Sequence, residues 1–306
     1  MLDRKSNRPR LVTASTHIMR HIYRYVKLLV LSMLVLYFCF SNIASVVYKS
    51  SEQSRWSEKR LIDFMNSKNN RAYFADLFSK GGFRSGMEVG VADGRFSEHV
   101  LRRSNSLPIV WYMVEPFPNA ALQRRFAISK AGTANFHNGS WSSEGVGPNA
   151  HKVFFKQLST DERLLNEIAD ESIDFIYLDG AHDYENVKKE LAPYYSKVRK
   201  GGLLAGHDYC NYGEQSLDCN GCDSVPRCGE YTEYGKRHGK GRGMGVNQAG
   251  VVRAVHEWLV ESEPSLALYH TTEDFTHRSL KKDGMDYELV ITSTRNPSWF
   301  VIKPMS

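Results

Sequence analysis

Five short apolar runs, each ending in polar or glycine residues, recur along the middle of the chain. They lie at residues 86–91, 109–116, 134–140, 172–180 and 201–209. Segments with the apolar spacing of a helix separate them, at 96–103, 119–130, 161–169 and 184–199. Alternating strands and helices predict a parallel sheet with right-handed crossovers, and continuous apolar runs are typical of strands buried on both faces.

The C-terminal part extends this pattern. Residues 248–261 read as an amphipathic helix, and later apolar runs lie at 266–271, 287–293 and 298–304. We therefore predict an α/β fold with a doubly wound, mostly parallel, seven-stranded sheet of the Rossmann-like kind. The predicted domain covers residues 70–306, preceded by a polar stem at 49–69.

An apolar run without charged residues lies near the start of the chain, at 28–48. It is long enough to cross the hydrocarbon core of a bilayer as a helix, and longer than the apolar part of a cleaved signal peptide. The arm before it, residues 1–27, has seven basic side chains and one acid. This asymmetry predicts a type II signal anchor with the domain in the lumen of the ER or Golgi. A buried helix or a cleaved presequence is the alternative.

The basic excess of the chain belongs to that arm. The formal net charge is +6, from 40 Lys and Arg against 34 Asp and Glu, and the arm accounts for all of it. The remaining residues are balanced in charge, so we expect no nucleic-acid partner.

A Cys- and Gly-rich segment, residues 210–246, interrupts the pattern and reads as an insertion loop. Four of the five cysteines of the chain fall in it, namely Cys210, Cys219, Cys222 and Cys228. Cys219 and Cys222 have the spacing of half a zinc site, but Cys210 and Cys228 form no matching pair. In an oxidising lumen two disulfides are the favoured interpretation, with zinc as the alternative.

Acids and glycines stand where the predicted strands end, which is where doubly wound folds bind ligands. The first strand is followed by an E-x-G-x-x-x-G pattern made of Glu88, Gly90 and Gly94. Glycines let a ligand approach the backbone closely, and an acid before them suits a ligand with a positive end. The second strand ends in Glu115, whose carboxylate can accept both hydroxyls of a ribose.

The third run ends in Ser140 and the fourth in Asp179. These strand ends, in this order, resemble the class I S-adenosylmethionine-dependent methyltransferases. The later segments D-G-A-H-D-Y, R-K-G-G and G-V-V-R-A-V-H-E-W resemble the subgroup that methylates hydroxyls of small molecules and sugars. The resemblance implies that Glu88, Gly90 and Gly94 face the methionine end of the cofactor, Glu115 the ribose and Ser140 the adenine, with Asp179 beside the methyl group.

The tripeptide His-Asp-Tyr occurs twice, at 182–184 and 207–209. In the first copy His182 is the candidate general base and Asp183 the predicted N-cap of a helix. The resemblance places possible ligands of a divalent cation, magnesium or manganese, at Asp179, His207 and Asp208. Metal-dependent relatives often have an acid where this chain has His207, which leaves the identity of the metal open.

We therefore predict a membrane-anchored O-methyltransferase that acts on a hydroxyl of a glycan or small molecule. Methyl transfer needs an acceptor held in line with the methyl group and a way to remove the proton of the hydroxyl. Two alternatives keep the same fold. One is a hydroxylase-like enzyme, and the other is a lumenal binding protein without turnover.

Overall fold

The computed structural model describes residues 55–68, 70–104, 107–126, 135–139, 149–210, 249–271 and 296–305. Backbone contacts divide the chain into two units, Met1–Ser54 and Arg55–Ser306, and every described residue belongs to the second. None of the helices in these ranges combines the length and the apolar character that a bilayer crossing requires. The run at 28–48 lies outside the described residues, and so do Cys219, Cys222 and Cys228.

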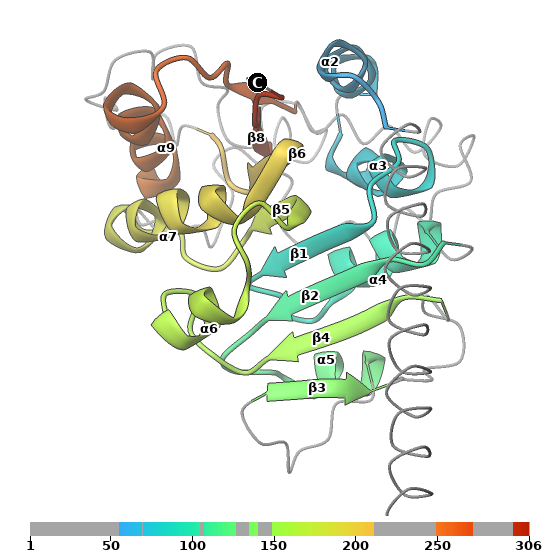
Figure 1. Cartoon of the computed structure of the whole chain (residues 1–306). Coiled ribbons are helices and arrows are strands. Elements are labelled where there is room, and N and C mark those ends of the chain that lie inside the picture. Colours follow the sequence, from blue (N-terminus) through green and yellow to red (C-terminus); the bar gives the residue numbers. More distant parts are fainter. Residues whose placement is uncertain are drawn as a thin grey trace, which may run out of the picture. The chain divides into compact units, whose positions relative to one another are not determined.

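One mixed sheet organises the second unit (Figure 1). Within the described residues its strands run in the order β3-β4-β2-β1-β5-β6-β8-β7. Five neighbours, β4, β2, β1, β5 and β6, are parallel, whereas β3 and β8 pair antiparallel with β4 and β6. The bounds are β1 Ser85–Val89, β2 Val110–Val114, β3 Asn135–Gly139, β4 His151–Phe155, β5 Ile173–Leu178, β6 Val198–Gly206, β7 Tyr269–His270 and β8 Trp299–Ile302. The predicted doubly wound, mostly parallel sheet is confirmed, and it contains one strand that the sequence pattern did not predict, β4.

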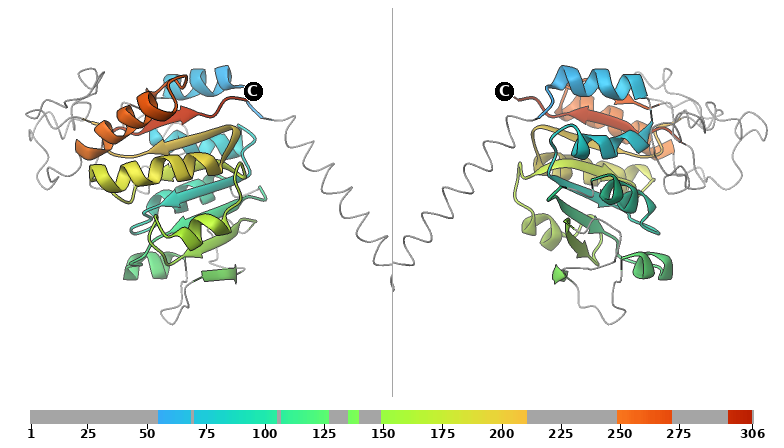
Figure 2. Two further views of the ribbon diagram at one scale, coloured as in Figure 1. Left: turned by 60° about the vertical axis from the view of Figure 1, so that its left-hand side comes forward. Right: turned by 90° about the vertical axis from the view of Figure 1, so that its right-hand side faces the viewer.

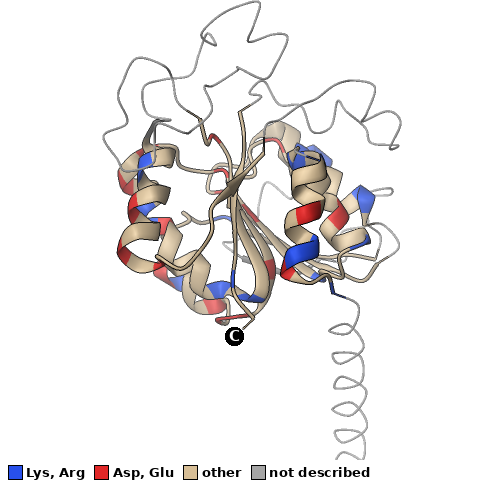
Figure 3. Cartoon of the chain, turned by 90° about the horizontal axis from the view of Figure 1, so that it is seen from above, with Lys and Arg blue, Asp and Glu red and all other residues tan. Residues whose placement is uncertain are grey.

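Helices cover both faces of the sheet (Figures 2 and 3). One hydrophobic core packs the first group of helices against one face, and a second core packs the later helices against the other. The first group is α2 Glu58–Lys68, the short 3-10 helix η1 Arg71–Tyr73, α3 Phe74–Ser79, α4 Arg95–Arg103 and α5 Ala120–Arg125. The second group is α6 Glu162–Glu167, α7 Tyr184–Lys197 and α9 Ala249–Ser262.

The third parallel strand is not where the sequence pattern placed it. The run at 134–140 forms β3, which lies antiparallel at the edge, and the strand beside β2 is β4. Its sequence, His-Lys-Val-Phe-Phe, begins with two polar residues, and Lys152 is buried in spite of its charge. A five-residue strand with a buried lysine lacks the continuous apolar signature that the prediction relied on.

Helix α2 belongs to the domain core, although the sequence assigned its residues to a stem. Leu61 and Met65 are buried in the same cluster as Phe74 and Phe78 of α3. Burial of such side chains stabilises the fold by roughly 2 kcal/mol each. The packed domain therefore begins near Arg55, some residues before the predicted start at residue 70.

Asp174 ties several segments together at the amino ends of the strands. Its Oδ2 accepts hydrogen bonds from the backbone N–H of Arg84 at 2.7 Å and of Ser85 at 2.8 Å. Its Oδ1 pairs with Arg55 at 3.5 Å and with Arg199. Arg55, the first described residue, is thus fixed near the amino ends of the strands. The candidate site lies at their carboxyl ends.

Candidate active site

A strained turn connects β1 to α4 at the carboxyl edge of the sheet. Gly90, Ala92 and Gly94 all have positive φ, at 83°, 51° and 81°. A Cβ atom on Gly90 would lie 2.2 Å from the Cα of Gly180, so the turn at β1 touches the turn at β5 backbone to backbone. Such conformations favour glycine, and they cluster at ligand sites. The turn lines a cleft of about 190 Å³ together with Glu88, Asp179, His182 and Asp208.

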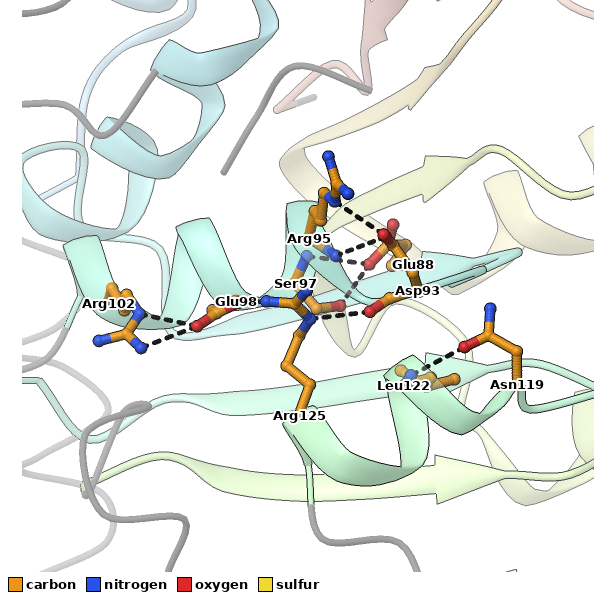
Figure 4. A network of polar contacts seen from close by, with 9 residues as sticks. All are labelled: Glu88, Asp93, Arg95, Ser97, Glu98, Arg102, Asn119, Leu122 and Arg125. Carbon is orange, nitrogen blue, oxygen red and sulfur yellow. Dashed lines mark hydrogen bonds and ion pairs between the residues drawn. The ribbon is translucent and has the colours of Figure 1, made fainter. Parts of the chain in front are cut away.

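Glu88 is 2% exposed and faces the start of α4 (Figure 4). Its Oε2 accepts hydrogen bonds from the backbone N–H of Ser97, at 3.1 Å, and from the Ser97 hydroxyl. Burial raises the pKa of this carboxyl well above its ordinary value, while Ser97 opposes the shift. Glu88 therefore supports the first turn of α4 and also contributes to the wall of the cleft.

Glu115 follows β2 and holds the same turn from the other side. Its Oε2 accepts a hydrogen bond from Ala92 N at 3.0 Å, and its Oε1 accepts one from Phe117 N at 2.9 Å. The carboxylate is partly exposed, and each oxygen keeps a lone pair for a further donor. This is the arrangement that recognition of a ribose diol requires.

Arg125 of α5 fixes the middle of the turn (Figure 4). Its Nε donates to the backbone carbonyl of Asp93 at 2.8 Å, and its NH1 pairs with Glu98 of α4. Glu98 also pairs with Arg102 at 2.8 Å. The strained backbone is therefore held by Arg125 of α5, which Glu98 of α4 fixes in turn.

Asp179, His182 and Asp208 come together where β5 and β6 end. Each offers one ligand atom, and these atoms lie within 4.8 Å of one another. His182 Nδ1 is 3.0 Å from Asp208 Oδ2. Burial alone would lower the pKa of His182, but the hydrogen bond and charge of Asp208 outweigh it and hold that pKa above 6.5. Two carboxylates and an imidazole at this spacing can bind a divalent cation, or they can hold a general base.

Asp208 is 1% exposed and has a left-handed backbone, with φ of 55°. Burial opposes its ionisation, yet His207, His182 and Asn296 together lower the pKa of this carboxyl far below its ordinary value. The Asn296 side chain donates to Asp208 Oδ1 at 2.6 Å. A strained, buried and charged aspartate at a strand end is typical of a functional residue.

His207 is buried beside the carboxylates of Asp179 and Asp208. Its Nδ1 lies 3.2 Å from Asp179 Oδ1 and 3.1 Å from Asp208 Oδ1, and its Nε2 contacts NH1 of Arg71. The group of potential ligands in the described residues contains His182 and not His207. Sequence reasoning missed Arg71, since η1 precedes the first strand and carries no recognisable motif.

The remaining residues of the two His-Asp-Tyr tripeptides are structural. Asp183 is confirmed as the N-cap of α7, accepting from Asn186 N at 3.1 Å. Tyr209 is buried, and its hydroxyl bonds His256 Nε2 at 2.6 Å.

The strand assignment changes which loop follows the third parallel strand. Ser140 lies outside the described residues, and the segment before it is not a parallel strand. The loop that follows the third parallel strand is 156–161. In it Gln157 is buried with its Oε1 unpaired among the described residues, and Leu158 is 58% exposed. A buried acceptor without a donor fits a ligand that supplies one.

We expect Glu115→Ala to weaken S-adenosylmethionine binding roughly 10- to 100-fold, because hydrogen bonds to a charged acceptor contribute about 1.5–3 kcal/mol. Thermal stability should fall modestly, since Ala92 N and Phe117 N lose their partner but the site is partly exposed. Isothermal titration with the full-length chain checks this. Glu162→Ala, at an exposed acid of α6, is the matched control. Unchanged affinity in Glu115→Ala would remove this residue from the site.

A buried acid beside the site predicts a dependence of stability on pH. Glu190 of α7 is 1% exposed, and burial raises its pKa to about 7, although Ser159 and His182 oppose the shift. The folded chain then keeps this proton where the unfolded chain, with an ordinary pKa of 4.5, has lost it. The contribution of Glu190 to stability is therefore fully present below pH 4.5 and is lost as the pH rises to about 7.

We expect Glu190→Gln to abolish this part of the pH dependence of the unfolding free energy. The variant should then be more stable than wild type by roughly 3 kcal/mol at pH 8 and equally stable near pH 4.5. Urea unfolding of both proteins between pH 5 and 8 measures the difference. Glu185→Gln, at an exposed position of the same helix, should follow wild type. Parallel pH curves for Glu190→Gln and wild type would contradict the expected ionisation.

Comparison with solved structures gives distant resemblances over most of the chain. An O-methyltransferase from Bacillus cereus, crystallised with SAH, has 13% identity and a TM-score of 0.45, covering 85% of this chain and 90% of its own. An O-methyltransferase family protein from Burkholderia thailandensis has 11% identity and a TM-score of 0.40, covering 76% and 55%. Spermidine synthase from Thermotoga maritima has 10% identity and a TM-score of 0.39, covering 78% and 62%.

The comparison with protein families gives the functional evidence. No curated protein matches the chain. Residues 87–209 match the family model of a methyltransferase domain. The match begins in β1 and ends just after β6, so it contains Glu88, Glu115, Asp179 and Asp208. It supports a methyltransferase domain in this segment, with S-adenosylmethionine as the cofactor.

Proposed function

We propose that this chain is an S-adenosylmethionine-dependent O-methyltransferase. The observation that carries the proposal is the pairing of two sites along one edge of the sheet. The turn of Gly90 to Gly94, with Glu115, fits the cofactor, and Asp179, His182 and Asp208 lie in the same cleft. S-adenosylmethionine supplies an electrophilic methyl group. The second site supplies groups that orient a hydroxyl acceptor and remove its proton.

His182 is the proposed general base. Asp208 Oδ2 binds its Nδ1, which leaves Nε2 to accept the proton of the acceptor hydroxyl. A carboxylate behind an imidazole fixes its tautomer and stabilises the charge that forms on it. Asp179, beside it, is placed to orient the hydroxyl. The cofactor end of the cleft would hold the methionine part against Glu88 and the ribose against Glu115, with adenine near Gln157 and Leu158.

A divalent cation is the second candidate for this site, favoured by the spacing of its three side chains. Asp179, His182 and Asp208 would hold it, and a bound cation lowers the pKa of a hydroxyl. The mixed carboxylate and imidazole set suits manganese as well as magnesium. Metal removal separates the two schemes, because only the cation scheme loses activity in EDTA and regains it with added metal.

The setting of the reaction is also part of the proposal. Residues 28–48 have the length and composition of a signal anchor, and the basic arm before them favours a lumenal domain. A glycan or a secreted small molecule is the acceptor class that fits this compartment, and disulfides in the 210–246 segment fit it as well. Protease protection of the domain in intact microsomes tests the orientation, and digestion there would overturn it.

The decisive experiment is titration of the full-length chain with S-adenosylmethionine, followed by transfer from methyl-labelled cofactor to a panel of glycans and small hydroxyl compounds. Micromolar binding and labelled product are expected. A folded chain that binds no cofactor would overturn the proposal. The mass of the product distinguishes methyl transfer from hydroxylation, because methyl transfer adds a net CH₂ to the acceptor and hydroxylation adds an oxygen atom.

A further inference from the structure

Arg71 places a buried cation in a cleft that four carboxylates line, those of Glu88, Asp93, Asp179 and Asp208. It is 3% exposed and contributes to the wall beside Glu88, Asp179 and Asp208. The turn that carries it is fixed, because the Asn70 side chain accepts a hydrogen bond from Ala72 N at 2.8 Å. Arg71 precedes the segment that matches the methyltransferase family. A part of the chain outside that segment therefore reaches the candidate site.

The contact between Arg71 and His207 determines which nitrogen of the imidazole carries the proton. NH1 of Arg71 contacts His207 Nε2. A guanidinium has donors only, so Nε2 must offer its lone pair. The proton of a neutral His207 then resides on Nδ1. That nitrogen lies 3.2 Å from Asp179 Oδ1 and 3.1 Å from Asp208 Oδ1, where it donates to carboxylates on two different strand ends.

We propose that Arg71 is a positioning residue that holds His207 in its Nδ1–H tautomer, so that His207 fixes Asp179 and Asp208 relative to each other. The two oxygens of Asp208 then have separate partners. Oδ1 receives His207 and Asn296, and Oδ2 remains for His182. In this role His207 is neither the general base nor a metal ligand. The division of the Asp208 oxygens between these partners is compatible with both the general-base scheme and the cation scheme.

This inference rests on the proposed function for its consequence on turnover, but the tautomer can be measured without cofactor or acceptor. The first experiment is a long-range proton–nitrogen NMR correlation on full-length wild type labelled at histidine nitrogen. The His207 signal is identified by its absence in His207→Gln. We expect a protonated Nδ1 and an unprotonated Nε2. A protonated Nε2 in wild type would overturn the proposal, whatever the activity of the protein.

The second experiment removes the guanidinium. Arg71→Met should release the tautomer and lower kcat about 10- to 100-fold, the usual effect of losing a residue that orients a site, while the affinity for S-adenosylmethionine stays within about threefold. Arg71→Lys keeps a cationic N–H donor and should retain the tautomer, with an intermediate kcat. The matched control is Arg103→Met, which breaks a partly buried ion pair with Asp76 away from the cleft.

A double-mutant cycle completes the test. If Arg71 acts through His207, Arg71→Met should cost less than about threefold in the His207→Gln background. Equal losses in both backgrounds would overturn the proposal, as would an unchanged His207 signal in a folded Arg71→Met protein. Arg103→Met should lose thermal stability while its imidazole signals and kcat stay those of wild type. If the cofactor binds but no acceptor is methylated, the proposed function fails and the tautomer result still stands.

Discussion

Gly90→Ala is expected to abolish detectable S-adenosylmethionine binding, a loss of roughly 100-fold or more, because the new methyl group has nowhere to go. Its Cβ would lie 2.2 Å from Gly180 Cα and 2.4 Å from Asp179 O, and both contacts are to backbone atoms that cannot rotate away. The positive φ adds about 1–2 kcal/mol of strain for any residue with a side chain. The turn must therefore separate from β5, and this displaces both the cofactor turn and Asp179.

Gly180→Ala is the matched control, since it adds a methyl group to the other side of the same contact. Its Cβ would meet Gly90 at 3.5 Å, which is ordinary van der Waals contact. Thermal unfolding should therefore show a lower Tm for Gly90→Ala and little change for Gly180→Ala. Isothermal titration of the folded proteins gives the affinities. Binding by Gly90→Ala within threefold of wild type would show that the cofactor does not use this turn.

Asp208→Asn is expected to lower kcat roughly 100-fold or more, because it removes the charge that supports His182 and leaves the backbone unchanged. Asparagine tolerates the left-handed conformation of this position and can still accept from Asn296. The pKa of His182 should fall once the carboxylate is lost, since only the smaller effects of the Asp179 and Glu190 charges then oppose burial. A base works only when unprotonated, so the acidic limb of the residual kcat/KM profile should move to lower pH.

Asp183→Asn is the control for this change, because it alters the acid of the other His-Asp-Tyr tripeptide and preserves the helix cap. Its kcat and pH profile should match wild type within a few-fold. An Asp208→Asn protein whose acidic limb does not move would exclude His182 as the base. If that protein instead recovers activity at high manganese concentration, the cation scheme is favoured.

The strand ends were predictable because their signal is local. Glu88 lies near the end of an apolar run, Glu115 and Asp179 directly follow one, and the parallel order brings such positions to one edge. The third parallel strand was placed wrongly, at the segment that forms β3. Both β3 and β4 are five residues long and begin with a polar residue, and β4 contains a buried lysine, so neither has the continuous apolar run of a buried parallel strand.

The roles of the two histidines depend on tertiary contacts that no local pattern contains. His182 and His207 have the same neighbours in sequence, Asp and Tyr, yet Asp208 Oδ2 binds one and Arg71 contacts the other. Arg71 lies more than 100 residues away in sequence and on a different element. The sequence pattern predicted which residues lie together at the carboxyl ends of the strands. Their hydrogen-bond partners are set by the tertiary structure and could not be predicted from the pattern.

The contacts of Asp174 have a consequence for how the domain can be attached to a support. Arg55 joins the domain beside Asp174, and the last strand leaves it beside Gly201, whose N–H bonds Lys303 O at 2.8 Å. Both points lie toward the amino ends of the strands, and β5 alone separates Asp174 from Asp179 by roughly 16 Å. A bead or a fusion partner attached directly at Arg55 or after the last strand would therefore join the domain on the side away from the cleft and leave the cleft open.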